Sequence, residues 1–177
     1  KPAPLGNRTD FRDVPFVTID PADARDHDDA CFAERDPDPK NKDGYLIWVA
    51  IADVAHYVRP TSKLDQEARL RGNSTYFPDR VVPMLPDRLS GDLCSLHEGV
   101  PRASIVVRMQ IDKDGQKLGH MFFRGLIKSH ASLTYEEVQS AVDGQPDDKC
   151  SPLLETVIRP LYDAYHALVK ARELRAP

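Results

Sequence analysis

The sequence predicts an α+β domain with a mixed or largely antiparallel sheet core and flanking helices. Three observations lead to this expectation: strand-like apolar runs dominate the first part of the chain, helical patterns gather toward its end, and fifteen prolines are spread throughout. Proline interrupts long helices, so its distribution argues against a helical bundle. With 177 residues, 41% of them hydrophobic, the chain is long enough for one globular domain with its own core.

The first expected strand follows a polar beginning. Residues 1–13 read as an irregular linker to a domain at 14–177, and the end of the chain suggests a piece of a longer protein. Residues 14–20 form an apolar run that predicts a buried strand ending at Asp20. Pro21 stops this strand because it has no backbone N–H to donate to a neighbour.

Two further strands are expected to form a hairpin. The turn-rich segment Asp36–Gly44 separates the apolar residues around Ala30–Glu34 from the continuous apolar run Tyr45–Ala52. Asp53 closes the second strand as Asp20 closes the first one. A turn or capping role for Asp53 and a role beside a metal site are equally compatible with this position.

The second half of the chain predicts one more hairpin and most of the helices. Alternating residues over Ser104–Asp112 and Lys117–Ile127 indicate two strands joined at Asp114-Gly115. Four helices are expected. A capping box at Ser62 with a stop at Gly72 predicts the first one, and a short helix over Asp87–Leu96 is the second.

The other two helices lie near the end of the chain. A capping box at Thr134 predicts a helix that ends near Gly144, and Ser151-Pro152 starts an amphipathic helix that Pro160 kinks or restarts.

Composition limits the class of protein. No run of about 18 apolar residues occurs, so no membrane span or membrane partner is expected. Three separated cysteines without a CxxC pair argue against a disulfide framework or zinc site and favour a reducing, cytoplasmic location. The net charge of −4 argues only weakly against a nucleic-acid binder, because one acidic motif accounts for more than this excess.

That acidic motif lies between the first two strands. Residues 18–30 contain five aspartates: Asp20, Asp23, Asp26, Asp28 and Asp29. Carboxylates this close repel one another, which destabilises the fold unless a cation neutralises them. They can face one site only if the chain turns there, because alternate residues of an extended strand point to opposite sides. The motif therefore favours a magnesium site over a solvated acidic turn.

Oxygen ligands suit Mg²⁺, which binds them at about 2.1 Å and keeps waters for a substrate phosphate to replace. The spacing does not fit a calcium loop of the EF-hand type, which needs a central Gly and a terminal Glu. His27 is interpreted as a spacer, since a hard cation prefers oxygen. The aromatic segment around Tyr76 could pack in the core or stack against a base, and the residues alone leave both readings open.

Several motifs together resemble the ribonuclease II/ribonuclease R family, and the ribonuclease R branch most closely. The first is Thr18-Ile19-Asp20-Pro21 followed by Asp23-Ala24-Arg25-Asp26-His27-Asp28-Asp29-Ala30. The others follow in the family's order: Val49–Val54, Arg71–Pro78, Val82–Pro86, Leu93–Leu96 and Ser129–Tyr135. The resemblance covers about residues 8–175 and places the chain in the N-terminal half of a ribonuclease II-type nuclease domain.

The resemblance implies a processive 3′-to-5′ exoribonuclease that hydrolyses RNA to nucleoside 5′-monophosphates with two Mg²⁺ ions, for which Mn²⁺ can substitute. It assigns the metal ligands and catalytic residues to Asp20, Asp26, Asp28 and Asp29 and leaves Asp23 outside this set. We interpret Asp23 as a residue of the loop structure that pairs with Arg25. The resemblance also implies that Tyr76 stacks on the nucleotide at a single-stranded RNA 3′ end. Tyr135 matches a tyrosine near the ribose, although packing on the core remains an alternative.

One departure from the family pattern is expected to matter. The family's nuclease domain is roughly twice as long and later carries a Ser-Pro-Ile-Arg-Arg-type segment, whose arginine contacts the scissile phosphate. This chain lacks that segment and the flanking cold-shock and S1 modules, which are its expected partners together with the rest of the nuclease domain. We therefore expect the piece alone to be weak or inactive. A non-catalytic RNA-binding relative of the same fold is the alternative function.

Overall fold

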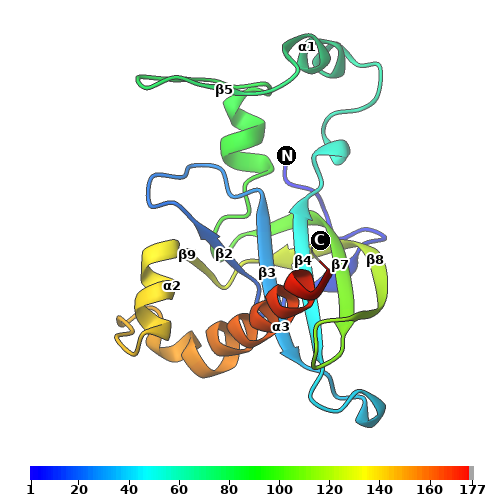
Figure 1. Cartoon of the computed structure of the whole chain (residues 1–177). Coiled ribbons are helices and arrows are strands. Elements are labelled where there is room, and N and C mark those ends of the chain that lie inside the picture. The colour runs from blue at the N-terminus through cyan, green and yellow to red at the C-terminus, as the bar shows by residue number, and fades with distance from the viewer. Residues whose placement is uncertain (176–177) are drawn as a thin grey trace.

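The computed structural model describes residues 1–175, and its centre is a single mixed sheet of seven strands (Figure 1). The strands are β1 (Thr9–Phe11), β2 (Val17–Asp20), β3 (Asp29–Arg35), β4 (Tyr45–Ala52), β7 (Pro101–Ile111), β8 (Lys117–Lys128) and β9 (Ala131–Thr134). Their order across the sheet is β1-β8-β7-β4-β3-β2-β9. The outer pairs β1–β8 and β2–β9 are parallel, and the pairs between them are antiparallel. The predicted mixed sheet is confirmed.

Helices cover one face and one edge of this sheet. The helices of the sheet layer are α2 (Tyr135–Val142) and α3 (Arg159–Arg175), whereas α1 (Lys63–Arg71) lies away from the sheet (Figure 1). The short helical turns are η1 (Pro39–Asn41), η2 (Val54–His56), η3 (Arg88–Leu93), η4 (Ser151–Leu153) and η5 (Leu154–Ile158). Figure 1 shows α3 crossing the sheet in front of β3 and β4. The predicted restart at Pro160 is confirmed, because η4 and η5 precede α3, whose second residue is this proline.

The capping signals in the sequence produce the expected helix starts. Ser62 accepts a hydrogen bond from the N–H of Asp65 at the start of α1, and Gly72 ends that helix with φ 78°. At α2, Thr134 accepts from the N–H of Glu137, while the Glu137 carboxylate accepts from the N–H of Thr134. This reciprocal pair satisfies two backbone donors that a helix start otherwise leaves free.

Two apolar clusters hold the layers together. The larger one joins Phe16, just before β2, and sheet residues such as Val17 and Val106 to η3 and α2. The smaller one lies between α3 and the sheet and includes Ile47 of β4 and Ala164 of α3. Because close packing of small residues lets a helix approach a strand, α3 can lie directly on β3 and β4.

The beginning of the chain differs from the expected irregular linker. Thr9–Phe11 form β1, which pairs in parallel with β8, and Arg8 is buried beside it. The sheet therefore starts within residues 1–13, before the predicted boundary. The sequence also did not predict β9 or the small two-stranded sheet of β5 (Thr75–Tyr76) and β6 (Val81–Val82). These strands have only two to four residues, too few for a periodic pattern.

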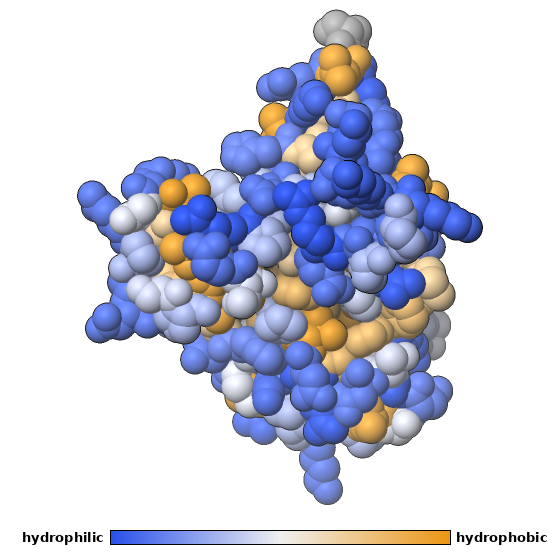
Figure 2. Space-filling view, turned by 90° about the horizontal axis from the view of Figure 1, so that it is seen from below, coloured by the Kyte–Doolittle hydropathy of each residue, from blue (hydrophilic) through white to orange (hydrophobic). Residues whose placement is uncertain are grey.

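One segment stands away from the sheet. We call residues 59–87, with α1, β5 and β6, the projecting arm; Figure 1 shows it beyond one end of the strands. No residue of α1 is buried, and both β5 and β6 are exposed. Figure 2 views the opposite end, where the surface is mostly hydrophilic and apolar side chains form separate patches. Within residues 1–175, no helix has the length and apolarity that crossing a membrane requires.

Candidate active site

The aspartate motif forms a loop at the end of β2. Asp20 is the last residue of β2 and Asp29 is the first residue of β3, so residues 20–29, here called the acid loop, connect two neighbouring strands. The N–H of Ala52 donates to the carbonyl of Asp28 at 2.9 Å, which extends the β3–β4 pairing into the loop. The chain therefore turns at the aspartates, as a shared site for their side chains requires.

A second contact attaches the middle of the acid loop to the segment after η3. The N–H of His27 donates to Oγ of Ser95 at 3.0 Å, and the carbonyl of His27 accepts from the N–H of Leu96 at 2.8 Å. Ser95 and Leu96 are almost fully buried. Since these partners belong to the core, the position of His27 is set by the fold rather than by solvent.

The His27 side chain contacts an aspartate that the sequence predicts as a site residue. Its Nδ1 lies 2.7 Å from Oδ2 of Asp20, and each side chain is 16% exposed. Sequence reasoning treated His27 as a spacer and missed this contact. The local sequence carried no signal for it, because the pair forms only when the loop folds back over seven residues.

The carboxylates raise one another's affinity for protons. The pKa of Asp28 is raised, first because it is partly removed from water and then because the charges of Asp26, Asp29 and Asp20 repel its own. The pKa of Asp29 is raised for the same first reason and by the charge of Asp20. A cation would relieve this repulsion, because opposite charge favours the ionised form of a carboxylate.

The residue types in the acid loop fit a hard divalent cation, since they supply carboxylate oxygens. Within residues 1–175, however, no three side chains of His, Cys, Asp or Glu converge closely enough to hold a metal ion. The donor chemistry suits such a cation. The magnesium site itself stays a prediction, and so does its ligand set of Asp20, Asp26, Asp28 and Asp29.

A softer metal has less suitable ligands here. Desolvation, followed by the charges of Asp29 and Asp20, raises the pKa of the neighbouring Cys31 thiol to about 12. The raised pKa disfavours the thiolate, which is the form that soft metals bind.

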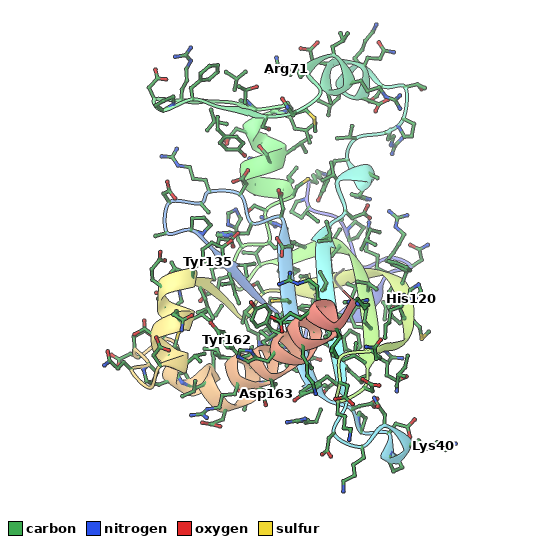
Figure 3. All side chains as sticks on the ribbon, in the orientation of Figure 1. Lys40, Arg71, His120, Tyr135, Tyr162 and Asp163 are labelled. Carbon is green, nitrogen blue, oxygen red and sulfur yellow. The ribbon has the colours of Figure 1, made fainter. Side chains whose placement is uncertain are left out.

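Tyr135 lies beside the acid loop through strand pairing. Asp20 of β2 pairs with Thr134 of β9, so the next residue, Tyr135, starts α2 directly next to the end of β2. Figure 3 shows Tyr135 at this position, at the start of α2. Its side chain is 56% exposed, which argues against the alternative of packing in the core.

Tyr76 comes from a different element. It belongs to β5 of the projecting arm, where it pairs with Val81, and its side chain is 69% exposed. Buried packing therefore does not explain this aromatic residue. Figure 1 shows β5, the strand that contains Tyr76, beyond the end of the sheet at which the acid loop joins β2 to β3, on a separate segment.

Asp53 has a structural role in this fold. Its Oδ2 accepts hydrogen bonds from Arg8 and from Arg124, each at 2.7 Å, and its side chain is 2% exposed. Arg8 also donates to the carbonyl of Gly125. The carboxylate thus joins the chain start to β8 at the end of β4. Its role is structural, but it differs from the predicted capping role, because the side chain makes no capping hydrogen bond to η2. The expected pairing of Asp23 with Arg25 is not among the ion pairs of residues 1–175.

Comparison with known proteins identifies relatives of the whole chain. Ribonuclease R of Escherichia coli is 46% identical over 170 residues, which cover 95% of this chain and 20% of that protein. A structure of Mycoplasma genitalium RNase R in complex with double-stranded RNA superposes with a TM-score of 0.88 at 31% identity, covering 96% of this chain and 29% of the other. The chain thus spans about a fifth of the length of that first relative.

The fold also occurs in a protein described as a pseudonuclease. The structure of yeast Ssd1 superposes with a TM-score of 0.74 at 17% identity, over 94% of this chain and 20% of that one. Fold alone therefore does not establish nuclease activity. The RNB domain matches residues 8–176, almost the whole chain. The chain belongs to the ribonuclease II/ribonuclease R family of RNB-domain proteins.

Proposed function

We propose that the protein carrying this chain is a 3′-to-5′ exoribonuclease that hydrolyses RNA to nucleoside 5′-monophosphates. The observation that carries the proposal is the acid loop, which presents four aspartates between β2 and β3 next to Tyr135. Membership of the RNB-domain family and 46% identity to a ribonuclease R support the same activity. We expect the protein to act in the cytoplasm.

The four aspartates are the proposed metal ligands and catalytic residues. Asp20, Asp26, Asp28 and Asp29 would hold two Mg²⁺ ions, and Mn²⁺ is an expected substitute. Such ions would supply activation of a water and stabilisation of the leaving oxygen in a phosphoryl transfer. The backbone hydrogen bonds of His27 and Asp28 would hold the loop so that the carboxylates lie on one side of it. Asp23 lies outside this set.

Two exposed tyrosines are the proposed contacts to RNA. Tyr135 directly follows Thr134, which pairs with Asp20 across the sheet. An RNA 3′ end bound at the aspartates would therefore lie near the Tyr135 hydroxyl, which would recognise the ribose 2′-OH that separates RNA from DNA. Tyr76 offers an exposed ring, and stacking on a base is independent of sequence because every base has a π-face. The preferred substrate is then a single-stranded RNA 3′ end of any sequence.

The remaining contacts are proposed to come from other parts of the protein. The rest of the nuclease domain would supply a cationic clamp for the phosphate, and cold-shock and S1 modules would deliver RNA. A missing transition-state donor typically costs about 2.7–4 kcal/mol. We therefore expect the chain of 177 residues to be weak or inactive when isolated.

The alternative function is RNA binding without catalysis on the same fold. Yeast Ssd1, which is described as a pseudonuclease, has this fold. All four proposed ligands are present in this chain, which favours the enzyme. The two functions differ in one observable, the release of mononucleotides.

Substitution of one proposed ligand in the full-length protein tests the proposal. Asp29→Asn should reduce Mg²⁺-dependent release of mononucleotides by at least about 10²-fold, because it removes a ligand charge while keeping the shape of the side chain. Binding of a labelled single-stranded RNA should persist. Asp23→Asn is the matched control in the same loop and should retain activity. Full activity of Asp29→Asn would refute the assignment, and an inactive wild-type protein that binds RNA would favour the alternative.

A further inference from the structure

We propose that His27 is a positioning residue, which orients the Asp20 carboxylate toward the cation that the acid loop is proposed to bind. This inference rests on the proposed function and deepens it. His27 is not a ligand in this assignment, and it is not an inert spacer.

The contact between the two side chains is directional. An ionised carboxylate only accepts hydrogen bonds, so Nδ1 of His27 carries the hydrogen and donates it to Oδ2 of Asp20 across 2.7 Å. Both side chains are 16% exposed, which limits competition from water. With Oδ2 engaged in this way, the second carboxylate oxygen of Asp20 remains available to a cation.

The histidine can orient Asp20 because its own backbone is anchored on both sides. Its N–H donates to Oγ of Ser95, and its carbonyl accepts from the N–H of Leu96. Ser95 is fully buried, and its carbonyl accepts from Nε of Arg102 at 2.9 Å. Arg102 is 5% exposed and also pairs with Asp92. A continuous chain of hydrogen bonds thus connects the core to the Asp20 carboxylate.

The hydrogen bond from His27 to Asp20 resembles the hydrogen bonds that fix metal-binding side chains in other proteins. A histidine or carboxylate that ligates a metal is commonly fixed by a hydrogen bond from a second residue, and loss of that residue weakens metal binding by about 10- to 100-fold. A spacer would make no directed contact. The His27 ring makes one, to an aspartate at the end of β2.

Calorimetric titration of the full-length protein with Mg²⁺ tests the inference without measuring activity. His27→Phe keeps a ring of similar size and removes the donor, so Mg²⁺ affinity should fall by about 10- to 100-fold. His27→Asn places an amide N–H near the position of Nδ1 and should recover most of the affinity. His120→Phe is the matched control, because His120 is an exposed residue of β8, which lies toward the opposite edge of the sheet from β2 (Figure 3).

Urea unfolding without Mg²⁺ shows whether each variant folds. If His27→Phe does not fold, His27→Leu removes the same donor with a smaller side chain and carries the same expectation. Equal Mg²⁺ affinity of the wild type and the donor-free variant overturns the inference while the proposed nuclease stands. Failure of His27→Asn to recover affinity also overturns it, because the ring would then act in another way.

The remaining outcomes separate the inference from the function. A wild-type protein that binds Mg²⁺ in a His27-dependent way but releases no mononucleotides refutes the nuclease and supports the positioning role. A wild-type protein that binds no Mg²⁺ overturns both the positioning role and the metal assignment.

Discussion

The acid loop and the projecting arm carry the two halves of the proposed site, but the fold holds them very differently. No residue of the acid loop is buried, but the loop starts directly after the buried residues Val17 and Thr18 and is hydrogen-bonded through His27 to the buried Ser95 and Leu96. The arm exposes 84% of Leu70 and 69% of Tyr76. Contacts with buried residues hold a loop in place, whereas an exposed segment with few core contacts opens at a lower free-energy cost. The loop is thus suited to hold metal ligands and the arm to adapt to a substrate.

Their ion pairs differ in the same way. Close to the acid loop, at the end of β4, Asp53 joins Arg8 and Arg124 with its carboxylate almost fully buried. In the arm, the Arg80–Asp79 pair has side chains that are 62% and 69% exposed. Exposed pairs contribute little to stability, while a buried charge that loses its partner is strongly destabilising.

The largest expected effect is on stability. Asp53→Asn removes the charge that neutralises the buried Arg8, so the free energy of unfolding should fall by about 3–5 kcal/mol in urea titrations. Asp79→Asn in the arm is the matched control and should leave the unfolding curve unchanged. Equal effects of the two substitutions would remove the distinction between the two regions.

An intermediate effect is expected on RNA binding. Tyr76→Ala should weaken binding of a single-stranded RNA by about 1–3 kcal/mol, the usual contribution of one stacked base. Fluorescence anisotropy in an Asp29→Asn background measures this without hydrolysis. Stability should not change, because the side chain is 69% exposed. Tyr76→Trp keeps an aromatic ring and should bind the RNA as tightly as the wild type. If Tyr76→Ala also binds as tightly, Tyr76 does not stack on RNA.

The smallest effect concerns pH. Burial alone would raise the pKa of Asp53, but hydrogen bonds from Arg124 and Arg8 outweigh it and hold the pKa below its ordinary value of 3.8. The unfolded chain then binds the proton more readily than the folded one. The stabilisation is therefore complete above pH 3.8 and is lost as the pH falls through the lowered pKa.

Unfolding in urea between pH 2 and 7 should show this loss in the wild type, in the range set by the lowered pKa. Asp53→Asn has no such group at this position, so its stability should depend less on pH over the same range. An identical pH dependence of the two proteins would show that Asp53 does not have the assigned role.

Local patterns predicted the long strands and the capped helices. The apolar run Tyr45–Ala52 is β4 as expected, and the capping box at Thr134 starts α2. The strands β1 and β9 were missed because each is short and pairs in parallel with a distant segment. No signal within three or four residues encodes such pairing.

The candidate site shows the same limit. The aspartates and Tyr135 are evident as residue types, but the pairing of Asp20 with Thr134 that brings Tyr135 near them depends on sheet register. The contact of His27 with Asp20 depends on how the loop folds. The role of Asp53 depends on two arginines from distant segments, Arg8 before β1 and Arg124 in β8. Side-chain partners that come from distant segments cannot be read from local sequence.

Binding of divalent cations by the acid loop is tested most directly with Mn²⁺, because anomalous diffraction shows the position of this ion. Crystals of the full-length protein grown with Mn²⁺ should show anomalous peaks within about 2.5 Å of carboxylate oxygens of Asp20, Asp26, Asp28 or Asp29. A well-ordered acid loop without such a peak, or Mn²⁺ bound only elsewhere, would contradict the account.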